Sequence, residues 1–139
     1  MVDQPKLDQM TANLGRYVAA LRDLAQVPAD QFISNPDKIG NAKYHFVIAI
    51  ETCIDIANHI IASEHLRFPK DSAESFSILG ESGWLDPTIH EQLTAMARFR
   101  NRLVHLYWQI DDARVYEYLQ SSLSDFDTFV SQIIRRVGA

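Results

Sequence analysis

Residues 89–107 read I-H-E-Q-L-T-A-M-A-R-F-R-N-R-L-V-H-L-Y, and their spacing predicts an amphipathic helix. At about 100° per residue, one apolar stripe of this helix takes up Ile89, Leu93, Met96, Ala97, Leu103, Val104 and Tyr107. Arg100 falls in the middle of that stripe. A guanidinium stays charged at any ordinary pH, and burying it without a partner would cost on the order of several kcal/mol. The side chain of Arg100 therefore requires a carboxylate partner, a cleft or an anionic ligand.

Four further segments carry apolar residues at the three- and four-residue spacing that is typical of amphipathic helices. Together with the first stretch, the expected helices span residues 6–25, 36–65, 72–79, 87–107 and 112–136. Their connections are short, and no alternating run of polar and apolar residues indicates a strand. The sequence therefore predicts an all-α, up-and-down bundle of four main helices and one short helix. At 139 residues, the whole chain (1–139) is expected to form a single domain.

Local signals indicate where these helices begin and which connecting residues join the core. Asn35 and Asp86 each precede a proline, which is typical of an N-cap followed by proline at the first helical position. Asp111 has the features of a third N-cap, because apolar residues stand just before it and four residues beyond it. The connecting residues that we expect to pack against the bundle are Phe32, Ile33, Trp84 and Leu85.

The composition, 47% hydrophobic and 22% charged, is that of a globular protein. The N-terminus lacks the apolar region of a signal peptide, and the longest apolar runs are far too short to span a bilayer, so we expect a cytoplasmic protein without a membrane anchor. The single cysteine, Cys53, lies on an apolar helix face and is expected to be a small core residue in a reducing compartment. The histidines are scattered without ligand spacing, so we expect neither a metal site nor a cofactor.

The formal net charge is −5 at pH 7. Proteins that bind nucleic acid by bulk electrostatics are usually basic overall, so any contact with RNA has to be local here. An acidic body with a small cationic patch fits a cleaving enzyme better than a protein that coats nucleic acid. It fits an interaction module equally well.

Several polar residues accompany Arg100 on the same helix. Asn101 and His105 stand four apart on one flank, where the amide can orient the imidazole. Arg98 and Arg102 lie further toward solvent. The helix thus offers a fixed cation, a group that titrates near neutrality and accessory cations, a combination that suits a phosphodiester.

Arg100 also has a purely structural explanation, in which it pairs with a carboxylate of a neighbouring helix. Glu51 and Asp55 share one flank of the expected helix 36–65. They are the nearest candidates for pairing Arg100 or for holding His105 in one tautomer. Alternatively, their flank is only a solvated face.

Residues 100–107 have the form R-x₄-H-x-Y, and the stretch F-R-N-R-L-V-H-L-Y-W-Q-I-D precedes a V-Y-x-x-L helix. These residues resemble the HepT-type toxins of the HEPN superfamily. Upstream, A-I-E-T-C-I-D-I-A-N-H-I-I (49–61) is similar to the second helix of that family. The likeness runs from about Leu14 to Phe129 and includes every position of the motif.

The resemblance implies an endoribonuclease toxin that cuts RNA without a metal ion, with Arg100 and His105 as its catalytic pair. Positions five apart on an ideal helix point about 140° away from each other. Either the helix unwinds near Leu106 or a second subunit completes the site, and the resemblance favours a homodimer whose cleft joins two motifs. In this family the tyrosine that matches Tyr107 is adenylylated by a partner antitoxin, a minimal nucleotidyltransferase, and this silences the enzyme.

Two functions therefore compete. One is the endoribonuclease toxin; the other is a non-catalytic helical bundle that binds a nucleotidyltransferase or a nucleotide through the same basic patch. The intact R-x₄-H with its following Asn favours the enzyme. Tyr107 has its own structural alternative, as a core tyrosine whose hydroxyl reaches the edge of the bundle.

Overall fold

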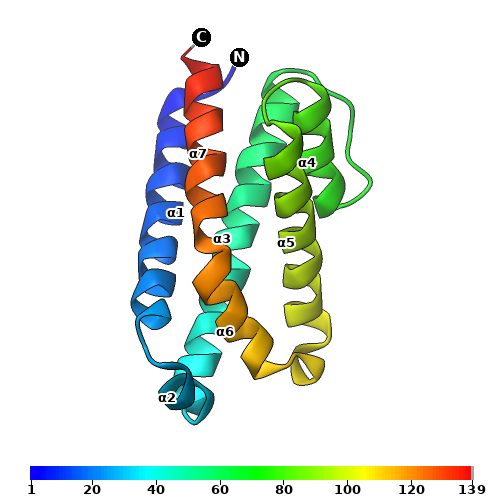
Figure 1. The fold of residues 1–139 in the computed structure, drawn as a ribbon. Coiled ribbons are helices and arrows are strands. Elements are labelled where there is room, and N and C mark those ends of the chain that lie inside the picture. Colours follow the sequence, from blue (N-terminus) through cyan, green and yellow to red (C-terminus); the bar gives the residue numbers. More distant parts are fainter. Residues whose placement is uncertain (139) are drawn as a thin grey trace.

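The computed structural model describes residues 1–138, and within that range it consists of helices and their connections, without strands (Figure 1). In chain order the elements are α1 (Gln4–Ala25), α2 (Ala29–Ile33), α3 (Pro36–Ser63), α4 (Ser72–Glu81), α5 (Pro87–His105), the 3₁₀ turn η1 (Tyr107–Gln109), α6 (Asp112–Ser121) and α7 (Leu123–Val137). The predicted all-α fold is confirmed.

Helix α3 lies at the centre of the bundle and contacts α1, α4, α5 and α6. In Figure 1, α1 and α7 run side by side on one flank of α3, while α4 and α5 cover the other flank. The two chain ends meet at one end of the bundle, and α2 and the end of α5 lie at the opposite end. The R-x₄-H-x-Y motif is therefore far from both termini.

The predicted helix starts are confirmed, and each has a capping hydrogen bond. The side chain of Asn35 accepts from the backbone N–H groups of two residues in the first turn of α3. The Asp86 carboxylate accepts from the N–H of Ile89, and the Asp111 carboxylate accepts from the N–H of Ala113. Such caps satisfy donors that have no partner inside a helix.

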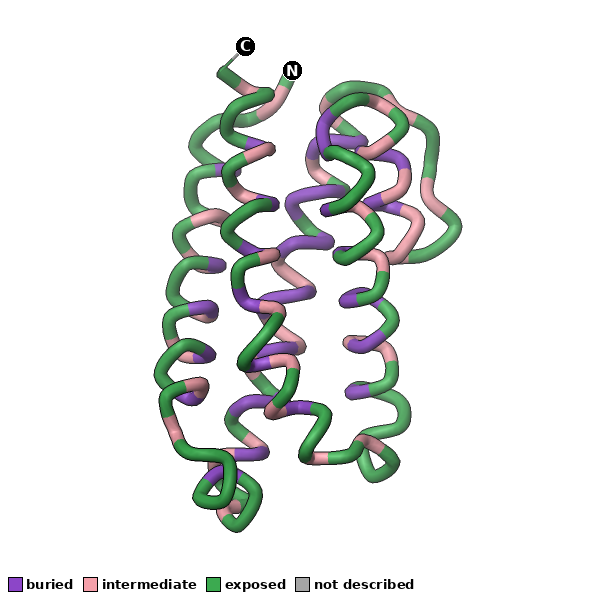
Figure 2. The backbone as a smooth tube through the Cα atoms, viewed as in Figure 1, coloured by how far each residue is buried: buried purple, intermediate pink, exposed green. Residues whose placement is uncertain are grey.

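The core is built from the inward faces of the helices, as the burial colouring in Figure 2 shows. Trp84 and Leu85 are buried between α4 and α5, as the sequence predicts. Cys53 is buried on α3, and loss of hydration raises the pKa of its thiol far above the ordinary range.

By length and composition alone, α3 could cross a membrane, because its most apolar 18-residue window has a mean hydropathy of 1.5. The expectation that every apolar segment is too short is therefore wrong for this helix. Half of that window is buried inside the bundle. The apolar surface of α3 thus has helices of the same chain as its partners.

The final helix differs from the prediction, because it breaks at Ser122 into α6 and α7. The hydroxyl of Ser121 donates to the carbonyl of Glu117, four residues back, a bond that bends helices. The N–H of Asp125 then bonds to the carbonyl of Ser122 at the tighter spacing of three residues. Two serines in succession therefore redirect the chain without proline or glycine.

A second difference lies in the connection before α3, where the chain forms the short helix α2. Phe32 is fully buried, as expected, but Ile33 is exposed. Helical geometry points consecutive side chains about 100° apart, so only one of these two neighbours can face the bundle.

The third difference concerns the end of α5, which stops at His105 because Leu106 leaves the helical conformation with φ −129° and ψ 37°. Tyr107 therefore lies beyond the helix and is exposed, and Val104, in the last turn of α5, is exposed as well, so neither extends the buried stripe. Phe99, which the expected stripe omits, is buried instead. Its ring stacks on Tyr118 of α6 at a centroid distance of 4.2 Å, so α6 covers this face of α5.

Candidate active site

The side chain of Arg100 lies between α5 and α3, where 24% of it is exposed. Its Nε and Nη2 donate to the same oxygen of Glu51, Oε1, at 3.1 and 2.6 Å. Of the two carboxylates that the sequence offers, Glu51 is therefore the one that pairs with Arg100. An ion pair at this depth orients the guanidinium as well as compensating its charge.

Arg100 keeps unused donors in spite of this pair. Its Nη1 donates to Oδ1 of Asn101 at 2.9 Å, so three of the five guanidinium N–H groups are engaged. The two N–H groups that remain belong to Nη1 and Nη2. This pair of atoms can donate to two oxygens of a phosphate. The guanidinium is thus held in place and can still bind an anion.

The expected contact between Asn101 and His105 is absent, because the Asn101 amide bonds to Arg100 instead. His105 is the last residue of α5 and is exposed. Within residues 1–138 its imidazole has no hydrogen-bond partner. Because α5 remains helical through His105, this imidazole and Arg100 point about 140° apart, and the break at Leu106 comes too late to bring them together.

The other predicted supporting residues lie around this pair. Arg98 and Arg102 are exposed, and the Arg102 guanidinium carbon lies 5.9 Å from the centroid of the Phe99 ring. Asp55 lies one turn beyond Glu51 on α3 and does not pair with Arg100. Loss of hydration raises the pKa of the Asp55 carboxyl, and the negative charge of Glu51 raises it further, whereas Arg100 and Lys6 oppose the rise.

Tyr107 lies in η1, where 47% of its surface is exposed, so it is not the core tyrosine of the alternative interpretation. Its ring packs against Lys43 of α3, whose Nζ lies 4.2 Å from the ring centroid. The hydroxyl lies next to Gly40, where a Cβ atom would be 4.0 Å from it.

Lys43 is a residue that the sequence analysis missed. Only 7% of its side chain is exposed, and its Nζ forms an ion pair with Oδ1 of Asp112 at 3.2 Å. The signal was present, because Lys43 interrupts an apolar stripe of α3 between Ile39 and Phe46 just as Arg100 interrupts that of α5. The reasoning that selects Arg100 also selects Lys43.

Residues 14–133 match the family model described as Ribonuclease HepT-like. The chain belongs to this HepT-like family. An mRNA nuclease HepT of Shewanella oneidensis is 35% identical over 83 residues, which are 60% of this chain and 62% of that protein, less than two thirds of its length. A tRNA nuclease HepT of Aphanizomenon flos-aquae is 27% identical over 120 residues, which are 86% of this chain and 82% of that protein.

Solved structures agree with the family assignment. The HEPN toxin of Shewanella oneidensis, tri-AMPylated and in complex with an MNT antitoxin, is 26% identical to this chain, with a TM-score of 0.88. The match covers 97% of this chain and 99% of that one. A toxin–antitoxin complex with AMP-PNP gives a TM-score of 0.87 at 25% identity, over 93% of this chain and 97% of that one. The HepT-like bundle is thus similar over nearly its whole length to toxins held by their antitoxins.

Exposed apolar side chains surround the motif of this HepT-like chain. Val104, Leu106 and Trp108 are exposed at the end of α5, and Tyr44 is exposed on the adjoining helix α3. Tyr44 stands seven residues before Glu51, so the two share a face of α3. Monomeric proteins seldom gather large apolar residues in this way unless another surface covers them.

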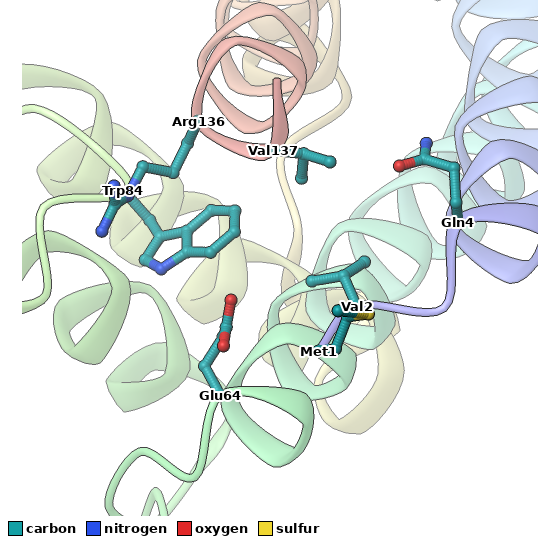
Figure 3. A pocket seen from close by; sticks show the side chains of 7 residues that line it. All are labelled: Met1, Val2, Gln4, Glu64, Trp84, Arg136 and Val137. Carbon is teal, nitrogen blue, oxygen red and sulfur yellow. The ribbon is translucent and has the colours of Figure 1, made fainter. Parts of the chain in front are cut away.

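A cavity near the start of α1 and the end of α7 is remote from the R-x₄-H-x-Y residues. It has a volume of about 450 Å³ and is lined by Met1, Val2, Gln4, Glu64, Trp84, Arg136 and Val137 (Figure 3). The Arg136 guanidinium carbon lies 5.3 Å from the centroid of the Trp84 ring. This cavity lies at the opposite end of the bundle from the last turn of α5, which ends at His105.

Replacing Asp55 with asparagine should stabilise the HepT-like bundle at neutral pH. A carboxyl whose pKa is raised in the folded state binds protons more tightly there than in the unfolded chain, so ionisation weakens the fold as pH rises above the ordinary carboxyl pKa of 3.8. The difference in Tm between Asp55→Asn and the wild type should therefore be positive at pH 7 and shrink as the pH approaches 3.8. A Tm gain that is constant across this range would contradict the assigned cause.

Proposed function

We propose that this chain is a metal-independent endoribonuclease, the toxin of a toxin–antitoxin pair. In this proposal it cuts RNA at a site that two subunits complete, and a nucleotidyltransferase antitoxin silences it by adenylylating Tyr107. The observation that carries the proposal is the Arg100 guanidinium, held by Glu51 and Asn101 with two donors free, on the helix that ends in an exposed His105.

The chemistry needs a base, an acid and a cation. In RNA the ribose 2′-hydroxyl can attack the adjacent phosphate once a base removes its proton, and an acid then protonates the departing 5′-oxygen. An imidazole can accept a proton or donate one, so we assign His105 to proton transfer. The free donors of Arg100 bind the non-bridging oxygens and stabilise the charge that develops on phosphorus. No step in this scheme requires a metal ion.

The direction of the side chains supports the proposal of a second subunit. Arg100 and His105 diverge by about 140° within one chain, so we propose that a second copy of α5 helps to enclose the phosphate. The apolar residues around the motif supply a surface for that copy.

Cleavage of total RNA by the purified protein in EDTA is the decisive test, with the cut ends mapped by sequencing. We expect defined cut sites ending in 2′,3′-cyclic phosphate, which is the product of attack by the 2′-hydroxyl. The pairing of Arg100 with Glu51 also suits the competing function, a non-catalytic bundle that binds a nucleotidyltransferase. Absence of cleavage together with retained binding of that partner would establish this alternative.

The shared site can be tested by complementation. Arg100→Ala and His105→Ala proteins, unfolded and refolded together, should form mixed dimers with an intact arginine facing an intact histidine. Activity should then exceed that of either variant refolded alone, which is the matched control. Sedimentation at micromolar concentration should give twice the chain mass, and an active enzyme that sediments as a monomer would rule out the composite site.

The protein should act in the cytoplasm, where its proposed RNA substrate and antitoxin are found. The lone cysteine, buried on α3, is compatible with that reducing compartment.

A further inference from the structure

Lys43 joins α3 to the segment that follows α5 by two contacts of one ammonium group. Its Nζ lies 3.2 Å from Oδ1 of Asp112, the first residue of α6, and 4.2 Å from the centroid of the Tyr107 ring in η1. An ammonium that has lost nearly all its water requires such compensation, and an aromatic face and a carboxylate both provide it. Both contacts are therefore expected to persist, and together they fix the position of η1.

The consequence for Tyr107 is a ring that is held beside α3 in a residue that remains partly exposed. Lys43 covers one face of the ring, yet the residue remains half exposed. The hydroxyl end lies over Gly40, one turn earlier on α3, which has no side chain to cover it. A nucleophile for group transfer needs this combination, because a fixed orientation lowers the entropy lost on reaching the transition state.

We propose that Lys43 is a positioning residue for the modification of Tyr107, held in turn by Asp112. The inference rests on the proposed function and extends it to the mechanism of silencing. The Tyr107 oxygen attacks the α-phosphorus of a nucleoside triphosphate bound to the antitoxin and forms a new O–P bond. The bond from that phosphorus to the bridging oxygen breaks, pyrophosphate leaves with the electron pair, and the hydroxyl proton passes to water.

Methionine at position 43 removes the charge while keeping the length and apolar stem of the side chain. Replacing a buried ion pair with an apolar group of similar volume is generally tolerated, and the carboxylate left behind on Asp112 is 43% exposed and can be hydrated. Lys43→Arg keeps the cation and its attraction to the ring. Lys38→Met is the matched control, because Lys38 lies on the same helix and forms no ion pair within the described chain.

The rate of AMP transfer from ATP to each variant by the cognate antitoxin should separate these roles. We expect Lys43→Met to lower kcat about tenfold with little change in the KM for ATP, because the triphosphate binds to the partner. Lys43→Arg should retain most of the rate, and Lys38→Met all of it. Transfer to Lys43→Met at the wild-type rate, or a Lys43→Arg variant as slow as Lys43→Met, would overturn the proposal.

Two further readouts distinguish this inference from the proposed function. Amide hydrogen exchange of residues 106–111 should accelerate in Lys43→Met even without an antitoxin. Unchanged exchange would show that Lys43 does not fix the position of this segment. RNA cleavage by unmodified Lys43→Met should stay close to that of the wild type. Cleavage that falls in parallel with AMP transfer would mean that Lys43 supports the whole site and not Tyr107. If the wild-type protein itself accepts no AMP, the proposed silencing fails first, and the role of Lys43 fails with it.

Discussion

Replacing His105 with alanine should lower RNA cleavage by about a hundred- to ten-thousandfold, the usual contribution of a group that transfers a proton in the transition state. The fold should be unaffected, because the imidazole is exposed and forms no hydrogen bond within residues 1–138. Single-turnover cleavage rates and a thermal unfolding curve measure the two effects separately. Wild-type activity in His105→Ala would exclude the proposed mechanism.

Arg100→Ala should lower the rate of RNA cleavage by a similar factor for a different reason. Without the guanidinium, no cation would stabilise the charge that develops on phosphorus. The loss of stability should stay below about 1 kcal/mol, because the carboxylate left behind on Glu51 is 41% exposed and regains water. Arg100→Lys is the informative control, as it keeps the charge but cannot hold Glu51, Asn101 and a phosphate at once. An Arg100→Ala protein that unfolds, in a chain whose wild type cuts no RNA, would support the purely structural ion pair.

The antitoxin should silence the ribonuclease activity of the wild type completely and should leave that of Tyr107→Phe unchanged. Phenylalanine keeps the ring over Lys43 but lacks the oxygen that accepts adenylate, so the variant should fold and cut RNA while escaping modification. In the wild type, mass spectrometry should find one or more AMP masses on the peptide that contains Tyr107. Each AMP adds negative charge and bulk two residues beyond His105, where both oppose the approach of RNA. Adenylate on another residue, or a Phe variant that is still silenced by AMP transfer, would place the switch elsewhere.

The fold could be predicted to a large extent because helix starts are encoded locally. Asn35, Asp86 and Asp111 cap the helices that they were expected to cap, and each uses its own side chain to do so. The break at Ser122 was not visible, because serine is neutral in many helices and bends one only through the bond it makes. For the end of α5, unwinding near Leu106 was only one of two alternatives, because no glycine or proline follows His105 to mark the end of the helix.

At the candidate site, the sequence pattern identified the residues, whereas several of their contacts depend on the folded structure. A charged residue in an apolar stripe identified Arg100, and its partner Glu51 was among the two carboxylates proposed. The hydrogen-bond partner of Asn101 could not be predicted. It depends on which N–H of the Arg100 guanidinium remains free once Glu51 has paired with Arg100. Tyr107 leaves the stripe because α5 ends at His105, and its ring then packs against Lys43 of α3, a contact that spans 64 residues of sequence.

Because the thiol of Cys53 is buried, its chemical reaction can report when the helical bundle opens. Alkylating reagents attack thiolates, and a thiol whose pKa is raised by burial supplies almost none while the helices remain packed. Iodoacetamide can therefore react with Cys53 only when the bundle opens transiently and exposes the middle of α3 to water. The labelling rate then follows the population of opened molecules. With a single cysteine in the chain, one modified mass records that event. If the proposed antitoxin binds only the folded bundle, its addition should slow the reaction.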